Sequence, residues 1–285
     1  MNVEEIACVF ACQDTPLIGI VHRPEHPARR GVLAMAAGGP QYRAGCCRQL
    51  VYMARALSAQ GIPVMRFDYR GMGDSGSEFR GFEQVEDDLA AALAAFTQAV
   101  PELNEVVLWG GCDAASAVLI NAYRYPIVTG LILGNPYAHS DETRAAVERQ
   151  YYLARLFDKA LWVKILKLEF NPLPAMRSIF NAFVPKRNAQ KNNPLESTLS
   201  APFTERMLEG LKRFHGRIFL MMSGQSLTSQ EFDELATRVP AWRKAVSAAN
   251  IERVDIPEAD QAFSTIEART RMIALAQQWL TRWPD

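Results

Sequence analysis

The hydrophobic positions of this chain form short runs that alternate with segments of helical periodicity. Five mostly apolar runs predict strands that are buried on both faces of a sheet, and they cover residues 31–37, 62–68, 105–109, 128–134 and 217–223. Segments that predict helices cover residues 48–60, 82–99 and 114–123. Strands that alternate with helices of this length favour an α/β fold, with a mostly parallel central sheet and helices on both faces.

Both ends of the chain extend this pattern, and one long segment interrupts it. Residues 6–10 and 17–22 predict an antiparallel hairpin, and residues 251–256 and 265–283 predict a last strand and a last helix. Residues 140–212 become helical and polar. We interpret residues 140–212 as a helical lid inserted over the C-terminal edge of the sheet, and residues 1–139 and 213–285 as the core domain.

Composition and charge exclude several classes of protein. Of the 285 residues, 49% are hydrophobic and 22% are charged, which is typical of a globular protein. The formal net charge is +0, which does not favour a nucleic-acid partner. No apolar stretch reaches the roughly 18 residues of a membrane span, and the acidic N-terminus lacks the features of a secretory signal. We therefore expect a cytoplasmic protein of unknown oligomeric state.

The cysteines do not form a recognisable structural framework. Their odd number argues against a set of disulfides, and their spacing does not resemble a zinc site. The five positions are Cys8, Cys12, Cys46, Cys47 and Cys112. We expect no metal and no cofactor.

The sequence around Cys112 is the most informative stretch. A predicted strand ends in Gly110-Gly111-Cys112-Asp113-Ala114 and leads directly into a predicted helix. This pattern is typical of a nucleophile elbow, with Cys in place of the usual Ser and Ala in place of the usual second Gly. A helix N-terminus beside the thiol favours the thiolate. The alternative is a tight glycine turn in which Cys112 is only a small buried residue.

A glycine-rich loop after the strand at residues 31–37 is the second candidate feature. In folds with an elbow, one oxyanion-hole N–H comes from the residue after the nucleophile, here Asp113, and the other from such a loop. We expect the second donor in the Pro40-Gln41 region. The alternative is an ordinary glycine turn. A further turn at residues 67–75 is expected to be structural.

These motifs resemble the α/β-hydrolase fold and, more narrowly, the family called hydrolase 1, exosortase A system-associated. The segments that carry the resemblance are GGPQYRAGCCRQ (38–49), IPVMRFDYRGMGDS (62–75), GGCDAASA (110–117), SGQSLTSQEF (223–232) and IPEADQAFS (256–264). The resemblance implies a hydrolase encoded beside exosortase and exopolysaccharide genes of Gram-negative bacteria. It does not imply a substrate.

The chain departs from the family pattern where the catalytic acid and base belong. The acid position after the strand at residues 217–223 holds Ser226, and the histidine position after the last strand holds Gln261. Cys46 and Cys47 stand where the resemblance leads us to expect a Ser-His pair. Glutamine cannot accept a proton near neutral pH, so the triad is expected to be incomplete.

Two other features bear on function. His139 follows the strand at residues 128–134 and is a candidate substitute base, the alternative being a solvated loop histidine. Between residues 144 and 191 there are ten basic and three acidic residues. This part of the lid is a candidate surface for an anionic membrane or polymer. The alternative is a solvated helix face.

Two functions remain open on these residues. The first is a hydrolase or acyltransferase that acts on an ester or thioester through Cys112, with Ser226 and Gln261 in the other triad positions. The second is a non-catalytic pseudo-hydrolase that binds a ligand or partner of the exopolysaccharide and exosortase machinery.

Overall fold

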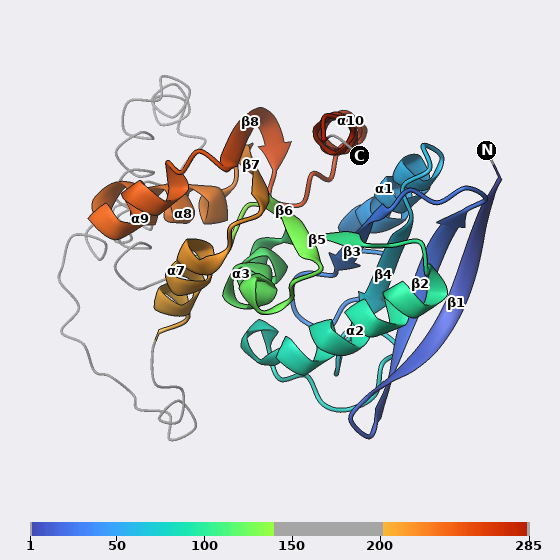
Figure 1. Cartoon of the computed structure of the whole chain (residues 1–285). Coiled ribbons are helices and arrows are strands. Elements are labelled where there is room, and N and C mark those ends of the chain that lie inside the picture. The colour runs from blue at the N-terminus through green and yellow to red at the C-terminus, as the bar shows by residue number, and fades with distance from the viewer. Residues whose placement is uncertain (1, 140–201, 284–285) are drawn as a thin grey trace, which may run out of the picture.

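A computed structural model describes residues 2–139 and 202–283 and shows one eight-stranded sheet (Figure 1). The strand order is β1-β2-β4-β3-β5-β6-β7-β8. Strand β2 is antiparallel to both β1 and β4, and all other neighbours are parallel. The strands are Val3–Cys12 (β1), Thr15–Pro24 (β2), Arg30–Met35 (β3), Val64–Asp68 (β4), Glu105–Gly111 (β5), Val128–Gly134 (β6), Arg217–Gln225 (β7) and Ile251–Asp260 (β8).

Helices cover both faces of this sheet. Helices α1 and α10 lie on one side, and α2 and α3 lie on the other (Figure 1). Helix α7 packs against α3, while α8 and α9 pack against each other beside β7. The helices are Gln49–Ser58 (α1), Glu86–Ala99 (α2), Cys112–Asn121 (α3), Phe203–Arg213 (α7), Leu227–Arg238 (α8), Pro240–Val246 (α9) and Ile266–Thr281 (α10). Short 3₁₀ turns are Cys46–Arg48 (η1), Phe82–Gln84 (η2) and Ala122–Arg124 (η3).

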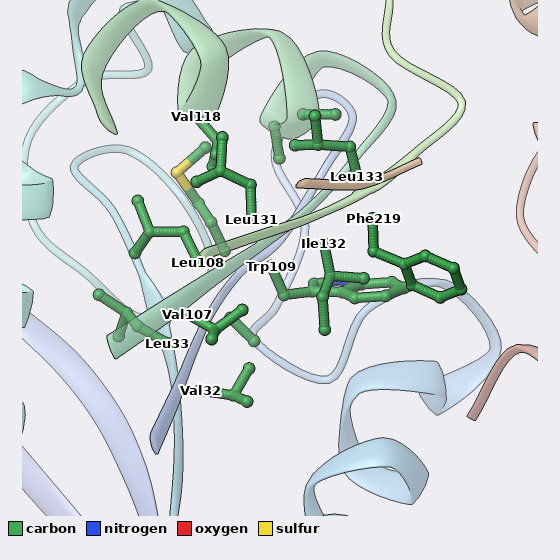
Figure 2. Close-up of a cluster of buried hydrophobic side chains, with 14 of the residues drawn as sticks. Val32, Leu33, Val107, Leu108, Trp109, Val118, Leu131, Ile132, Leu133 and Phe219 are labelled. Atoms are coloured by element: carbon green, nitrogen blue, oxygen red, sulfur yellow. The ribbon is translucent and has the colours of Figure 1, made fainter. Parts of the chain in front are cut away.

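Strand β5 lies in the middle of the core, and its successive side chains point to opposite faces of the sheet. Figure 2 shows Leu108 on the side of Val118 from α3, and Trp109 on the other side with Phe219. Phe219 stacks on Trp279 of α10 with ring centroids 5.5 Å apart. Each fully buried side chain of this kind contributes about 1.5–3 kcal/mol. Strand β5 is therefore held firmly from both faces.

The predicted fold class is confirmed, with local differences. The hairpin and the alternating strands and helices form as expected. The single helix expected over residues 82–99 begins as a separate 3₁₀ turn, because Val85 has non-helical dihedral angles. Helix α7 lies, except for Arg213, within the segment assigned to the lid but packs on α3 with Met207 buried. Residues 140–201 of the predicted lid lie outside the described residues.

None of the helices in residues 2–139 and 202–283 is long and apolar enough to cross a membrane. Within the same residues, no group of three or more His, Cys, Asp or Glu side chains is arranged to hold a metal ion.

The turn after β4 holds the loop that precedes α1. The buried carboxylate of Asp68 accepts hydrogen bonds from the backbone and the guanidinium of Arg43 and, at 3.2 Å, from the N–H of Asp74. Gly73 has a φ of +49°, and any Cβ on it would collide with the Asp68 carboxylate. These contacts give the turn at residues 67–75 a structural role.

His22 of β2 is fully buried beside Arg66 of β4. Arg66 Nε donates a hydrogen bond to His22 Nε2 over 2.9 Å, so this nitrogen is an acceptor and the ring is neutral. Burial, assisted by the charge of Arg66, lowers the pKa of His22 from 6.5 to about 4.

We predict that stability falls as the pH is lowered from about 7 to about 5. Over this range the unfolded chain takes up a proton on His22 while the folded chain does not, which lowers the free energy of unfolding by about 2 kcal/mol. Urea unfolding at both pH values measures the loss in the wild type and in His22→Gln, which keeps an acceptor for Arg66 but does not titrate. The same pH dependence in both proteins would contradict the assignment.

Candidate active site

Cys112 lies at the sharp turn between β5 and α3. Its φ is +50°, a left-handed conformation that costs a residue with a side chain roughly 1–2 kcal/mol. Gly110 permits the turn, because a Cβ there would come within 2.6 Å of the Ala114 carbonyl carbon. The half-buried thiol therefore sits at the N-terminus of α3. The strand, turn and helix have the geometry that the elbow motif predicts.

The side chain of Asp113 joins the elbow to the glycine-rich loop. Its Oδ1 accepts the N–H of Gly38 at 2.7 Å and the N–H of Ala114 at 2.9 Å. Burial raises the pKa of Asp113, and these two hydrogen bonds act in the opposite direction. The N–H of Gly38 in the glycine-rich loop therefore already donates its hydrogen bond to a carboxylate.

This arrangement changes the expected set of oxyanion donors. The backbone N–H of Asp113 directly follows the nucleophile and lies close enough to the Cys112 sulfur to lower the pKa of the thiol. Pro40 has no N–H and cannot donate, so that part of the sequence expectation is wrong on chemical grounds. Gln41 places its side-chain amide against Gly38, and a role for its backbone N–H stays a prediction.

The structure brings together the residues that follow β7 and β8. Ser226 Oγ donates a hydrogen bond to Gln261 Oε1 and accepts the N–H of Ser229 at 3.1 Å, which caps α8. The Gln261 side chain in turn interacts with the Cys112 sulfur. The Gln261 Nε2 atom is buried and has no hydrogen-bond partner of normal geometry among residues 2–139 and 202–283. Cys112, Gln261 and Ser226 therefore follow one another in space as nucleophile, base and acid would.

Asn135 supports Ser226 and Gln261 through hydrogen bonds to their neighbouring segments, and the sequence did not single it out. It is fully buried at the end of β6 and has a φ of +48°. Its Oδ1 accepts the Ser223 N–H and the Ser229 hydroxyl, each at 2.7 Å. Its Nδ2 donates to the backbone carbonyl of Gln261 at 3.0 Å. One amide thus connects the loops after β6, β7 and β8. The only signal in the sequence was its position directly after a strand.

His139 is paired with a carboxylate, which the sequence also did not reveal. Its Nδ1 lies 3.1 Å from Oε2 of Glu231, a residue of α8. The ring stacks on Tyr137 at a centroid distance of 5.9 Å, and the Tyr137 N–H donates to the Cys112 carbonyl. Tyr137 thus contacts both the His139 ring and the elbow. Among the described residues, no histidine hydrogen-bonds to the Cys112 sulfur.

The surroundings disfavour the thiolate of Cys112. Burial and the negative charge of Asp113 raise the pKa of the thiol, and the Asp113 N–H and the Gln261 side chain lower it by less. The stabilisation of the thiolate that we expected from the helix N-terminus is thus smaller than these opposing effects, because a buried carboxylate lies next to the sulfur. The site offers a thiol, the backbone N–H of Asp113 and a neutral amide. Within residues 2–139 and 202–283, no histidine side chain is placed to accept the proton of the thiol directly.

Comparison with known proteins places this geometry in context. The family described as serine aminopeptidase, S33, matches residues 42–215. No curated protein matches the chain. An esterase from Pyrococcus furiosus has a TM-score of 0.65 at 14% identity over 99% of this chain and 92% of that chain. Dienelactone hydrolase from Anabaena variabilis has a TM-score of 0.57 at 14% identity over 100% of both chains.

A third solved structure agrees with these two. The esterase domain of a Rhodothermus marinus protein has a TM-score of 0.59 at 16% identity over 99% of both chains. At such identities the similarity establishes the α/β-hydrolase fold. It does not transfer a substrate to this chain.

We predict that alkylation of Cys112 by iodoacetamide accelerates continuously from about pH 6 to above pH 9. The raised pKa keeps the thiol protonated at neutral pH, and the thiolate is the reactive form. Peptide mapping after timed quenching measures the rate at this residue, and exposed Cys47 serves as an internal comparison. A plateau in the Cys112 rate below pH 7 would show an activated thiolate and contradict the prediction.

Proposed function

The chain belongs to the serine aminopeptidase S33 family of α/β-hydrolases, and we propose that it reacts with esters or thioesters through Cys112. The observation that carries this proposal is the position of the Cys112 thiol on the elbow, with Gln261 and Ser226 beside it in triad order. The family name refers to serine, so a thiol nucleophile is a departure from it. A thiol is the stronger nucleophile and needs less help from a base.

The residues present support acylation better than hydrolysis. The Cys112 sulfur attacks the carbonyl carbon, and the Asp113 N–H lies next to the oxygen that becomes negative. Collapse expels the alcohol or thiol, which leaves with the proton from Cys112, and an acyl-cysteine remains. Hydrolysis of that thioester requires a base to activate water, and Gln261 cannot accept a proton. We therefore propose that acylation is faster than deacylation.

The His139–Glu231 pair is our proposed source of residual deacylation. Glu231 is nearly buried and orients the imidazole through Nδ1, which leaves Nε2 as the acceptor. The ring is partly exposed, so it can reach water in the mouth of the site. It would therefore act on water and not on the thiol.

A non-catalytic role is the alternative, and the Asp113 carboxylate favours it. A negative charge hydrogen-bonded to Gly38 opposes an oxyanion at the same place, because like charges repel in a buried site. Together with the substituted triad, this contact is what a binding protein on a former hydrolase scaffold would retain. Its ligand would belong to the exopolysaccharide or exosortase machinery.

The finer assignment rests on the motifs. We propose the exosortase A system-associated hydrolase 1 type on the basis of the five segments that resemble it. The basic part of the predicted lid, residues 144–191, lies outside the described residues, and its contact with an anionic membrane or polymer stays a proposal. The lid assignment and the cytoplasmic location also stay predictions.

We predict that restoring the acid and base together creates turnover. The double variant Ser226→Asp, Gln261→His is expected to hydrolyse p-nitrophenyl acetate about 100-fold or more faster than the wild type. Aspartate is also a good N-cap, so it can keep the hydrogen bond to the Ser229 N–H. Steady-state release of p-nitrophenolate measures the gain.

The controls separate a restored triad from a chance effect. The same double variant in a Cys112→Ala background should show no gain, and each single variant should gain much less than the pair. If the wild type already turns over as fast as the double variant, with a base titrating near pH 7, then an existing base serves Cys112 and the incomplete triad is wrong.

A further inference from the structure

Two neighbouring thiols near the candidate site have no part in the proposed reaction. Cys46 and Cys47 form the first part of the 3₁₀ turn η1, and their Sγ atoms are 3.9 Å apart. Cys47 is exposed and Cys46 is half-buried. The thiols are hydrogen-bonded to each other. When an oxidant reacts with one sulfur, the other thiol therefore lies close to it.

We propose that Cys46 and Cys47 are a reversible oxidation site, in which a hydroperoxide converts the two thiols into a disulfide. The Cys47 sulfur attacks the outer peroxide oxygen, which gives a sulfenic acid and releases water or an alcohol. The Cys46 sulfur then attacks the Cys47 sulfur and expels water. Two thiols lose two electrons and two protons, and the peroxide is reduced by the same two electrons.

The two cysteines lie outside the helix that follows them. Cys47 and Arg48 both have left-handed dihedral angles, with φ of 50° and 60°. The helix α1 begins only after them, at Gln49. Closing the bond therefore does not require any turn of α1 to unwind.

Geometry also makes the bond easy to break again. Adjacent Cα atoms are about 3.8 Å apart, whereas ordinary disulfides join Cα atoms about 4.4–6.8 Å apart. A disulfide between neighbours is consequently strained, and strained, exposed disulfides are the ones that cellular thiols reduce readily. This combination of exposure and strain is typical of a regulatory bond and not of a structural one.

The dithiol lies beside α10 and the end of β8. Arg269 of α10 donates a hydrogen bond to the Cys47 carbonyl at 3.4 Å. Cys46 is close enough to Asp260 for that carboxylate to help raise the pKa of its thiol, after burial and the neighbouring Cys47. Asp260 directly precedes Gln261. The proposal does not depend on acyl chemistry at Cys112.

Intact-mass and thiol measurements on the whole chain test this site. The reduced protein is treated with a small excess of hydrogen peroxide and the excess is removed. We expect a mass loss of about 2 Da, a titre that falls by two thiols, and a peptide with Cys46 linked to Cys47. Dithiothreitol should restore both thiols.

Matched variants identify the cysteines involved. Cys112→Ala keeps the dithiol and should still lose about 2 Da. Cys46→Ser and Cys47→Ser each retain one thiol of the pair and should instead gain oxygen or form adducts. If the wild type keeps its peptide of residues 46 and 47 reduced while Cys8, Cys12 or Cys112 is oxidised, the proposal is wrong. A linkage to any of those three cysteines would overturn it equally.

Discussion

The sharp turn between β5 and α3 is the constraint on which the site depends. Cys112 is held there at a φ of +50°, under a helix that approaches Gly110 too closely for any side chain. The strain is offset by β5, which lies between β3 and β6 with both of its faces buried. Because β5 is central and its neighbours are parallel, the loops that follow β3, β6, β7 and β8 lie at the same edge of the sheet as the elbow. Gly38 therefore contacts Asp113 of the elbow, and both Asn135 and Ser226 contact Gln261.

Ser226 and Gln261, which these loops bring to the triad positions, are polar but cannot act as bases. A histidine and an aspartate at the positions of Gln261 and Ser226 would place ionisable groups in a partly buried site. The amide and hydroxyl found there keep the connections, since Ser226 caps α8 and contacts Gln261. The buried Nε2 of Gln261 remains without a partner of normal geometry in the described part of the chain. The remaining charge next to the sulfur is the carboxylate of Asp113, which works against both the thiolate and an oxyanion.

Local patterns predicted the framework well, and contacts between distant loops were beyond them. Apolar runs revealed the strands because a buried parallel strand has a composition of its own. The position of Cys112 followed from its small neighbours, and the triad positions Ser226 and Gln261 followed from the family pattern that the chain resembles. The hydrogen bonds of Asn135, the Gly38 contact of Asp113 and the partner of His139 join segments that are far apart in sequence. No periodicity encodes such pairs, because each depends on how two loops meet in space.

The most direct test of this account is the fate of an acyl group on Cys112. The whole protein is mixed with a small excess of p-nitrophenyl acetate at about pH 8, and intact mass is followed alongside p-nitrophenolate release. The account predicts a burst of about one equivalent and one acetyl group on Cys112 that persists while further release is slow, because acylation precedes a deacylation step without a competent base. Steady release with no burst and no adduct, unchanged in Cys112→Ala, would contradict it.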